Sequence, residues 1–546
     1  MSLRQRFINW WSDRLHIKDV PLSKIPDYMY SVNYWLGSMV AAAFFYEIIT
    51  GLFLLLYYAP SEPYTQTMYL IQKVPYGSLL LATHLYGAYA MIFLAYVHMF
   101  RNYFVKAYKK PRELQWMVGV ILLTLLQGVA FMGYSMTGDI LATDAVDVGR
   151  GITEGFPLVG KLFESIIFGN GTTLDLFTRL LGYHVLLVAL TGLLFGYHFY
   201  LAEMNGFMPH PKKAAYKAPA IIDQKDTTLN PWYPRNLLYM LELAFFTFGF
   251  IIIIPSILSI LPHVPILFSP YPSVSPTSPQ AKTIPAYPPW FFLFMYKVLD
   301  FRPLSPFDVV IISAFVPILY FLFVPILDRS DSLHPLSGWV FQAIGVIAII
   351  NFIQASVWAA VAPGVPVEPN VYIPVLAEPA IIVLIGFYFL AKRYGPHAQP
   401  STNVKGAAML ITLLATAIGL FTVTSNSISS LVESFSATKV VPVISGLLST
   451  GLIGVVLMKI EVTSTEKPHV KSMKKKIGLG WVYFFLTFLV VLAVIIAVTI
   501  WSFDPITQTS YFGIGLGTLF VIFGEVIALY HYAVYSYAKK RGEQSG

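Results

Sequence analysis

The chain has 546 residues, of which 56% are hydrophobic and only 12% are charged, and its mean hydropathy is +0.66. A soluble domain carries about twice that share of charge, so the composition excludes one and predicts an all-α, polytopic bundle of transmembrane helices. The net charge of +8 does not indicate nucleic-acid binding, because basic residues in a membrane protein mainly set its orientation. The lack of cysteine excludes disulfides and thiolate-held metal clusters within this chain.

The first segment, residues 1–32, is charged and aromatic and has no central apolar run. We interpret it as an amphipathic arm in the membrane interface rather than as a cleaved signal peptide. Apolar runs of about twenty residues follow, each long enough to cross a hydrocarbon core of about 30 Å. We predict about twelve spans: 33–58, 78–102, 114–134, 175–200, 237–260, 307–327, 338–362, 373–392, 406–424, 440–458, 478–501 and 511–537.

The spans divide into three predicted units. Spans 1 to 4 and the loop after them form an N-terminal core over 33–235, and spans 5 to 8 form a second part over 236–395. The polar stretch AKRYGPHAQPSTNVKG then introduces an additional four-span extension, 396–546, which is rich in Val, Ile, Leu and Gly. We expect His531, near the inner end of its last helix, to be an interfacial residue rather than a ligand.

Basic residues indicate the orientation of the bundle. Most Lys and Arg residues fall on one side when both termini are placed there, which predicts that both termini are cytoplasmic in a plasma-membrane protein. The opposite, outer side carries two long loops, 135–174 and 261–306. Loops of this length usually have a function or face a partner.

Four histidines lie within predicted spans 2 and 4 and form two pairs with one spacing. His84 and His98 are fourteen residues apart, and so are His184 and His198. Fourteen residues make about 3.9 helical turns, so each pair lies nearly on one helix face, with members about 21 Å apart. Both spans run from outside to inside. His84 is therefore expected at the depth of His184, and His98 at the depth of His198.

An imidazole inside a membrane is costly and normally has a partner. Bis-histidine ligation of haem iron satisfies all four rings at once, so we predict a dihaem four-helix core built from spans 1–4. His84 and His184 would hold the outer iron, and His98 and His198 the inner iron. The alternative is four core histidines bonded to helix carbonyls. A shared zinc site is disfavoured because the two tiers are too far apart.

Glycines in spans 1 and 3 repeat the same spacing. Gly37 and Gly51 are fourteen residues apart, and so are Gly119 and Gly133. A flat porphyrin against a helix needs a position without a side chain, which places Gly51 and Gly133 at the outer haem and the other two at the inner haem. Glycine also permits close helix packing, so each pair alone is weak evidence.

Two arginines are candidates to bind haem propionates through their planar side chains. Arg101 follows His98 by three residues at the inner end of span 2, and Arg179 precedes His184 by five residues at the outer end of span 4. The alternative for Arg101 is an interfacial residue that extends towards water.

Several stretches of the chain resemble cytochrome b of the bc1/b6f class over roughly residues 20 to 395. They are GLFLLLYYAP, HMFRNYF, PRELQWMVGV, TRLLGYH, PPWFFLFMYKVL, RPLSPFDVVIISAF and HPLSGWVFQAIGV. The resemblance implies an eight-helix unit with two haems, a quinol-oxidising site near the outer haem and a quinone-reducing site near the inner one. The extension resembles that of divergent subunits of archaeal quinol-oxidase complexes, in which the haems are b-type, or a-type in one or both sites.

The chain departs from the family pattern at both implied quinone sites. The family's Pro-Glu-Trp-Tyr motif is replaced by Pro288, Pro289, Trp290 and Phe291, so its carboxylate is missing. Other family residues are replaced by Met136, Thr137 and Gly138 after span 3, by Leu81 before the first histidine, by Glu203 after span 4, and by Tyr239 and Met240 at the start of span 5.

We therefore interpret the chain as a dihaem subunit of a respiratory complex that takes electrons from a lipid quinol and binds a Rieske-type iron–sulfur partner at its outer loops. Asp139 is the predicted proton acceptor, with a solvated loop residue as the alternative, and Trp290 is a second catalytic candidate. One rival function is a haem-bearing electron-conduit or assembly subunit of a terminal oxidase supercomplex. Another is a twelve-span secondary transporter, which the lack of similarity between the two halves disfavours.

Overall fold

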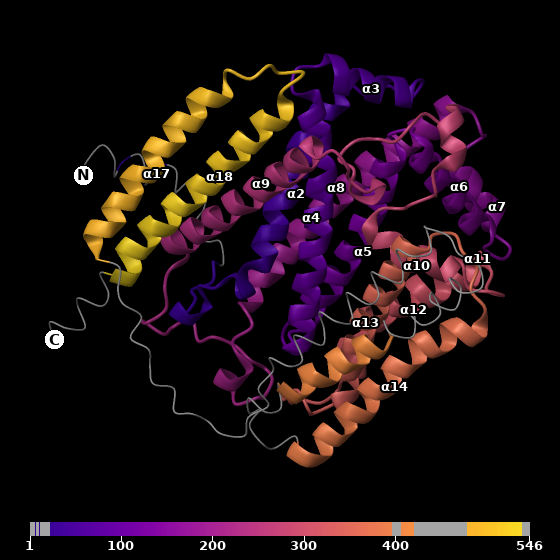
Figure 1. Cartoon of the computed structure of the whole chain (residues 1–546). Coiled ribbons are helices and arrows are strands. Elements are labelled where there is room, and N and C mark those ends of the chain that lie inside the picture. Colours follow the sequence, from indigo (N-terminus) through magenta and orange to yellow (C-terminus); the bar gives the residue numbers. More distant parts are fainter. Residues whose placement is uncertain (1–5, 7–9, 11–21, 396–405, 420–477, 538–546) are drawn as a thin grey trace.

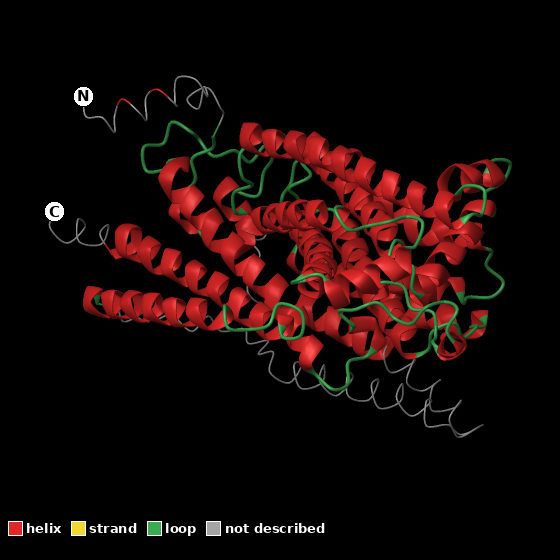
Figure 2. Ribbon diagram, turned by 90° about the horizontal axis from the view of Figure 1, so that it is seen from above, coloured by secondary structure: helices red, strands yellow, loops and turns green. Residues whose placement is uncertain are grey.

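The computed structural model describes residues 6, 10, 22–395, 406–419 and 478–537. Within these ranges the chain forms helices and loops with a few isolated β-bridges and no strand, which confirms the predicted all-α class (Figure 2). Ten of the described helices are long and apolar enough to cross a membrane. Predicted span 440–458 lies outside the described residues, and of predicted span 406–424 only the helix Gly406–Gly419 is described.

The first half of the chain supplies the four predicted core spans as α2, α4, α5 and α8. The helices of this half are α2 (Val32–Leu55), α3 (Pro63–Lys73), α4 (Gly77–Phe104), α5 (Glu113–Ser135), α6 (Ile140–Glu154), α7 (Gly160–Phe168) and α8 (Thr173–Asn205). The outer loop 135–174 is thus mostly helical, since it contains α6 and α7. Capping explains these boundaries, because the side chains of Asp139 and Thr172 accept backbone N–H groups at the starts of α6 and α8.

The second half contributes further spans and the short helix α10 in the other outer loop. Its helices are α9 (Leu237–Ile260), α10 (Leu293–Leu299), α11 (Pro306–Val310), α12 (Val316–Leu327), α13 (Trp339–Val361), α14 (Pro369–Tyr394), α17 (Leu479–Ile500) and α18 (Thr509–His531). The π-helical turn Ile311–Phe315 joins α11 to α12 in one span.

The four core helices pack in two pairs. α2 lies against α4, and α5 lies against α8. In Figure 1 these pairs occupy the middle of the molecule, with α9, α17 and α18 on one side and α10 to α14 on the other. The space between the two pairs is where the histidine-bearing faces of α4 and α8 are brought together.

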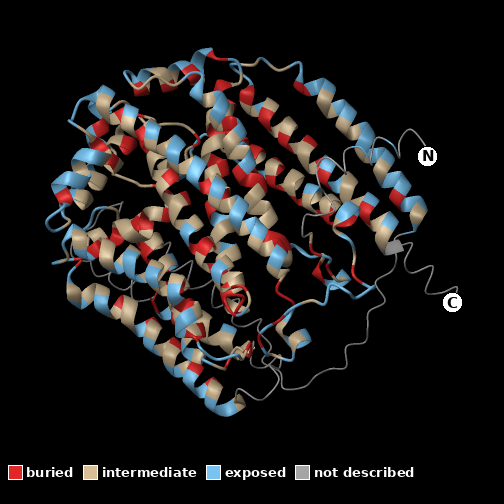
Figure 3. Cartoon of the chain, turned by 180° about the vertical axis from the view of Figure 1, so that it is seen from behind, coloured by how far each residue is buried: buried red, intermediate tan, exposed pale blue. Residues whose placement is uncertain are grey.

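The outward faces of the bundle are apolar. Exposed side chains on α17 include Trp481, Phe484 and Val498, and the exposed faces in Figure 3 run along the outer helices. A continuous apolar surface of this size is unfavourable in water and favourable in lipid. The protein is therefore a multi-pass membrane protein.

The described parts of the extension pack on the rest of the bundle, and α18 also contacts α4. α18 lies along α9 through facing glycines, and a Cβ on Gly517 would meet the carbonyl oxygen of Gly249 at 2.9 Å and Cγ1 of Ile253 at 2.5 Å. Small residues let membrane helices approach this closely. Residues 406–419 pack elsewhere, on α13 and α14, where Ile411 covers Gly386.

Candidate functional site

The outer histidines have hydrogen-bond partners on their Nδ1 atoms. Nδ1 of His84 lies 2.9 Å from the hydroxyl of Thr50 and 3.1 Å from Oε2 of Glu47, both on α2. Nδ1 of His184 lies 2.9 Å from the carbonyl oxygen of Val129 on α5. These acceptors favour the tautomer with a proton on Nδ1, which leaves the Nε2 lone pair of each ring available to a metal.

The inner histidines have different surroundings. The side-chain amide nitrogen of Asn102 lies 3.3 Å from Nε2 and 3.4 Å from Nδ1 of His98. His198 faces the backbone of Gln115, but its buried Nδ1 forms no hydrogen bond of normal geometry within the described part of the chain. The two tiers therefore share histidines at the same spacing but not their hydrogen-bonding partners.

Each predicted glycine faces the edge of one histidine ring, on the neighbouring helix of its pair. A Cβ added to the glycine would meet the ring's Cε1 atom at 2.9–3.3 Å in all four cases. The pairs are Gly51 with His84, Gly133 with His184, Gly37 with His98, and Gly119 with His198. The tiers are those that the spacing predicts, but the contact differs from our expectation, because the missing side chain makes room for an imidazole rather than for the flat face of a porphyrin.

A cavity of about 310 Å³ opens between the outer histidines. His84, His184, Gly51 and Gly133 all line it, and it continues towards the outer loop at Pro288. Two histidine rings whose Nδ1 atoms are already bonded, apolar walls and an open volume match the requirements of a bis-histidine haem, so the residues present fit such a group. In the described part of the chain no three His, Cys, Asp or Glu side chains gather as a site for a bare metal ion.

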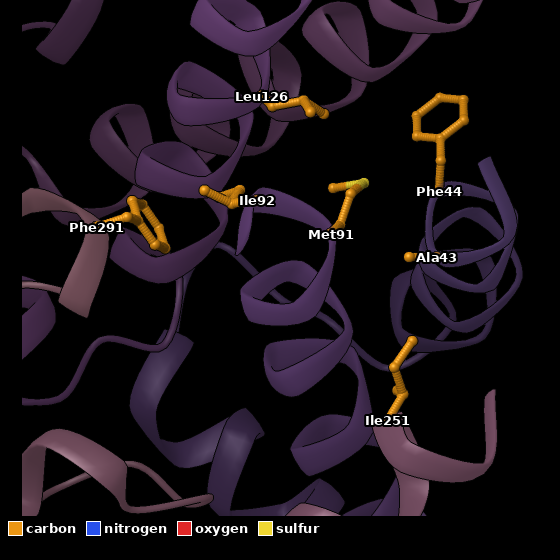
Figure 4. Close-up of a cluster of buried hydrophobic side chains, with 7 residues drawn as sticks. All are labelled: Ala43, Phe44, Met91, Ile92, Leu126, Ile251 and Phe291. Carbon is orange, nitrogen blue, oxygen red and sulfur yellow. The ribbon is translucent and has the colours of Figure 1, made fainter. Parts of the chain in front are cut away.

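An apolar layer separates the two tiers. Phe44, Met91 and Leu126 each lie midway, in sequence, between the inner and outer glycine or histidine of their own helix. All three belong to one buried cluster (Figure 4). The cluster also contains Ala43, Ile92, Ile251 of α9 and Phe291. The tiers are thus two separate sites across a packed core.

The two predicted arginines lie at opposite ends of the bundle. Arg101 contacts Asn33 and Asn102 through hydrogen bonds of 3.4 and 2.8 Å. Nε of Arg179 lies 3.1 Å from Oδ1 of Asp175, one turn earlier on α8. Arg101 contacts neutral amides and therefore remains available to an anionic partner at the inner tier. Arg179 is already paired with the Asp175 carboxylate, with which a propionate would have to compete.

Asp139 is a buried residue, so the interpretation as a solvated loop residue is wrong. Its carboxylate accepts hydrogen bonds from the backbone N–H of Ala142 at 2.9 Å and of Ser273 at 2.6 Å, and from the hydroxyl of Thr137 at 3.0 Å. Burial raises the pKa of Asp139, although these bonds act in the opposite direction. The residue lines the outer cavity while it caps α6 and holds the two outer loops together.

A second, smaller cavity of about 70 Å³ lies beside the first and shares part of its wall, including Pro288 and Pro289. Asp144 of α6 lines it, and burial together with the charges of Asp147 and Asp139 raises the pKa of Asp144. Trp290 lines neither cavity, because its ring packs on Phe93 and Phe352.

Two acidic residues of the outer half were not predicted from the sequence. Glu47 is a single carboxyl in an otherwise uncharged span, which is itself a signal of function. Asp144 gives no such signal, because only the fold of α6 over the 287–289 segment reveals that it faces a cavity.

The residues that replace the family pattern at the inner end form their own contacts. Glu203 accepts a 2.7 Å hydrogen bond from the backbone N–H of Ser23. His531 is buried at the inner end of α18, and Arg235 donates to its Nε2 at 3.1 Å. The ring of Tyr239 packs beside His531. These contacts attach the segment before α2 and the end of α18 to the inner end of the core.

Comparisons with known proteins agree with this architecture. A family model described as Cytochrome b(N-terminal)/b6/petB matches residues 89–276. Cytochrome b of Sulfolobus acidocaldarius is 36% identical over 96% of this chain and 97% of its own length. The menaquinol:cytochrome c reductase cytochrome b subunit of Bacillus subtilis is 29% identical over 37% of this chain and 96% of its own length.

A solved structure of a hyperthermophilic respiratory Complex III has a similar fold. It superposes with a TM-score of 0.51 at 22% identity, and covers 76% of this chain and 99% of its own. The similarity to the Sulfolobus protein extends through the extension as well as the core, because it spans almost the whole of both chains. By its sequence, its helical architecture and its histidine geometry, the chain belongs to the cytochrome b family.

Proposed function

We propose that this protein is the dihaem subunit of a respiratory quinol-oxidising complex and carries electrons from the outer to the inner side of the membrane. The repeated geometry of the histidines is the observation that supports this most strongly. Each ring projects from α4 or α8 onto a glycine of the adjacent helix, and the two tiers are fourteen residues apart. This duplicated arrangement is unexplained if the rings are ordinary core histidines bonded to carbonyls.

The chain's own residues would bind and orient the two haems. His84 and His184 would hold the outer iron, and His98 and His198 would hold the inner iron. Thr50 and the carbonyl of Val129 fix the outer rings through Nδ1. When bound, the haems supply one-electron redox chemistry, and the packed layer between the tiers keeps water out.

The quinol site is proposed where the two outer cavities share a wall at Tyr287, Pro288 and Pro289. Quinol becomes quinone by losing two electrons and two protons. One electron would go to an iron–sulfur partner and the other to the outer haem, while one proton passes to a base of this chain and one to the outer solvent. Pro289 and Phe291 have no basic group, so the base must be one of the cavity carboxylates.

Three carboxylates line the two cavities, and of these Glu47 already contacts His84, which leaves Asp144 and Asp139 as candidates for that proton. Asp139 was predicted from the sequence, but three hydrogen bonds already occupy it. The influences that act on the pKa of Asp144 all raise it, which favours uptake of a proton. We therefore place Asp144 first and retain Asp139 as the second candidate.

Names of relatives support the assignment to a complex. Those relatives include a menaquinol:cytochrome c reductase subunit and a respiratory Complex III. An iron–sulfur partner of the Rieske type is expected at the outer loops, because a chain without cysteine holds no such cluster. The distribution of basic residues supports a plasma-membrane location with both termini cytoplasmic.

Haem quantification tests the proposal directly. The purified protein should contain about two haem irons per chain, and a pyridine haemochrome spectrum should identify them as b-type or a-type. A ratio near zero would remove the redox function and leave a transporter as the alternative. Two haems that quinol cannot reduce in the intact complex would instead favour the electron-conduit or assembly subunit.

A further inference from the structure

Glu47 brings a carboxyl group into the apolar part of α2, directly beside a predicted haem ligand. Its Oε2 atom lies 3.1 Å from Nδ1 of His84. Its Oε1 atom is buried and has no hydrogen-bond partner in the described part of the chain. An acidic group in this environment is costly unless its partner repays the desolvation, so the contact with His84 requires an explanation.

α4 provides both the histidine and the space for the carboxyl group. A Cβ on Gly87, three residues after His84, would overlap Oε1 of Glu47. Any larger residue at this position would displace the carboxyl group from the ring. The packing of α2 on α4 at Gly87 therefore provides the space in which the Glu47 carboxyl group reaches His84.

Thr50 is the second neighbour of the same ring nitrogen. Its hydroxyl lies 2.8 Å from the carbonyl oxygen of Tyr46, to which it donates its only proton, and 2.9 Å from Nδ1 of His84. It must then accept from Nδ1. With Glu47 on the other side, the Nδ1–H group faces two acceptors, and Nε2 carries the lone pair.

The inner tier offers no equivalent group among the described residues. The amide of Asn102 contacts His98 and presents a donor, and the cation of Arg101 also acts on this ring, so neither is an acidic acceptor. An acceptor on Nδ1 makes an imidazole a stronger electron donor to its metal, and this stabilises the oxidised iron. The outer haem is therefore expected to have the lower reduction potential of the two.

We propose that Glu47 is a positioning residue that lowers the reduction potential of the outer haem relative to the inner one, through its contact with His84. The inference rests on the proposed dihaem function. It gives the direction of electron flow a structural cause, since an electron on the outer haem is held less tightly than one on the inner haem.

The test measures the midpoint potentials of both haems in the purified, haem-loaded protein. Glu47→Gln keeps the shape but weakens the acceptor, and Glu47→Met removes it with a flexible side chain of similar length. The outer potential should rise in Glu47→Gln and rise further in Glu47→Met, while the inner potential stays at its wild-type value. Glu242→Gln is the matched control, because this buried carboxyl faces His531 instead and should leave the outer potential unchanged.

An unchanged outer potential in both Glu47 variants, with both haems retained, would overturn the inference and leave the dihaem function intact. If the Glu47 variants lose the outer haem, Gly87→Ala provides the second measurement, because it moves the carboxyl group without removing it. A rise in outer potential there supports the proposal, and wild-type potential contradicts it. A wild-type protein without haem would mean instead that the proposed function itself has failed.

Discussion

The outer and inner halves of the core share the geometry of their histidines and differ in the groups that surround them. In both halves a histidine edge lies on a glycine, at 2.9 to 3.3 Å from the position that a Cβ would occupy. The outer rings are held by a hydroxyl, a carboxyl and a carbonyl, and they face an open cavity. Within the described residues, the inner rings are contacted by a side-chain amide and a backbone group, and Arg101 lies near His98. The placement of the histidine rings is thus duplicated, whereas the groups that contact them differ between the two halves.

Removing one histidine at a time should have the largest effect, because each change should remove one haem and leave the other. His84→Leu should abolish the outer haem and His198→Leu the inner one, so each variant should retain about half of the haem. Difference spectra of the reduced proteins should show two different missing components. The loss of the same component in both variants would show that the tiers are paired incorrectly.

Asp144→Asn should affect the outer half alone. Quinol-dependent haem reduction should slow by at least about tenfold, the lower range for a lost general base. Asp144 can accept a proton only when its carboxyl group is deprotonated, and its raised pKa means that this form appears at a higher pH than for an ordinary aspartate. The wild-type rate should therefore increase as pH rises through that pKa, and this increase should disappear in the variant.

Asp139→Asn is the matched comparison for Asp144→Asn. As a helix cap with three hydrogen bonds, Asp139 should contribute about 0.5–2 kcal/mol to stability. Thermal unfolding should detect this loss, while the pH profile of quinol oxidation stays as in the wild type. A slowed rate with unchanged stability would make Asp139 the proton acceptor, as the sequence first suggested.

Alanine substitutions at the glycines should lower haem content according to how closely each glycine approaches its histidine ring. Gly133→Ala should lower outer-haem content more than Gly51→Ala, because its Cβ would lie 2.9 Å rather than 3.3 Å from the ring. Gly182→Ala, on the same helix as His184, is the control, since a Cβ there meets nothing within 4 Å among the described residues. Equal haem content in Gly133→Ala and Gly182→Ala would show that the close approach is not required.

The smallest effect is expected at the inner tier. Asn102→Leu removes the amide beside His98 and should shift the inner potential less than Glu47→Gln shifts the outer one, because a neutral group is lost. Redox titration of both variants in the same lipid provides the comparison. A larger shift at the inner tier would reverse the asymmetry that the structure suggests.

Long periodic features of the molecule could be predicted from the sequence. The predicted span 237–260 coincides with α9, because an uninterrupted apolar run leaves a membrane helix as its only stable form. The grouping of glycines and histidines into two tiers also follows from the spacing, because a straight helix converts residue number into depth.

Short amphipathic elements and side-chain partners could not be predicted in this way. Helices α6 and α7 lie in a segment expected to be a loop, since they are too short to show a membrane signal. Asp139 resembles a solvated residue until Ser273, from the other outer loop, is seen to bond to it. Glu47 becomes informative only when α2 is known to pack on α4.

The buried layer formed by Phe44, Met91 and Leu126 has a consequence for the membrane as a whole (Figure 4). Electrons tunnel through packed hydrocarbon, whereas protons need water or polar groups to carry them. In the proposed function this layer is an insulating region of low dielectric constant between the two haems. Each electron that crosses the whole membrane moves one unit of charge through the electric field, which corresponds to about 2.3 kcal/mol per 100 mV. The apolar middle of the core would thus allow the protein to store redox energy as voltage.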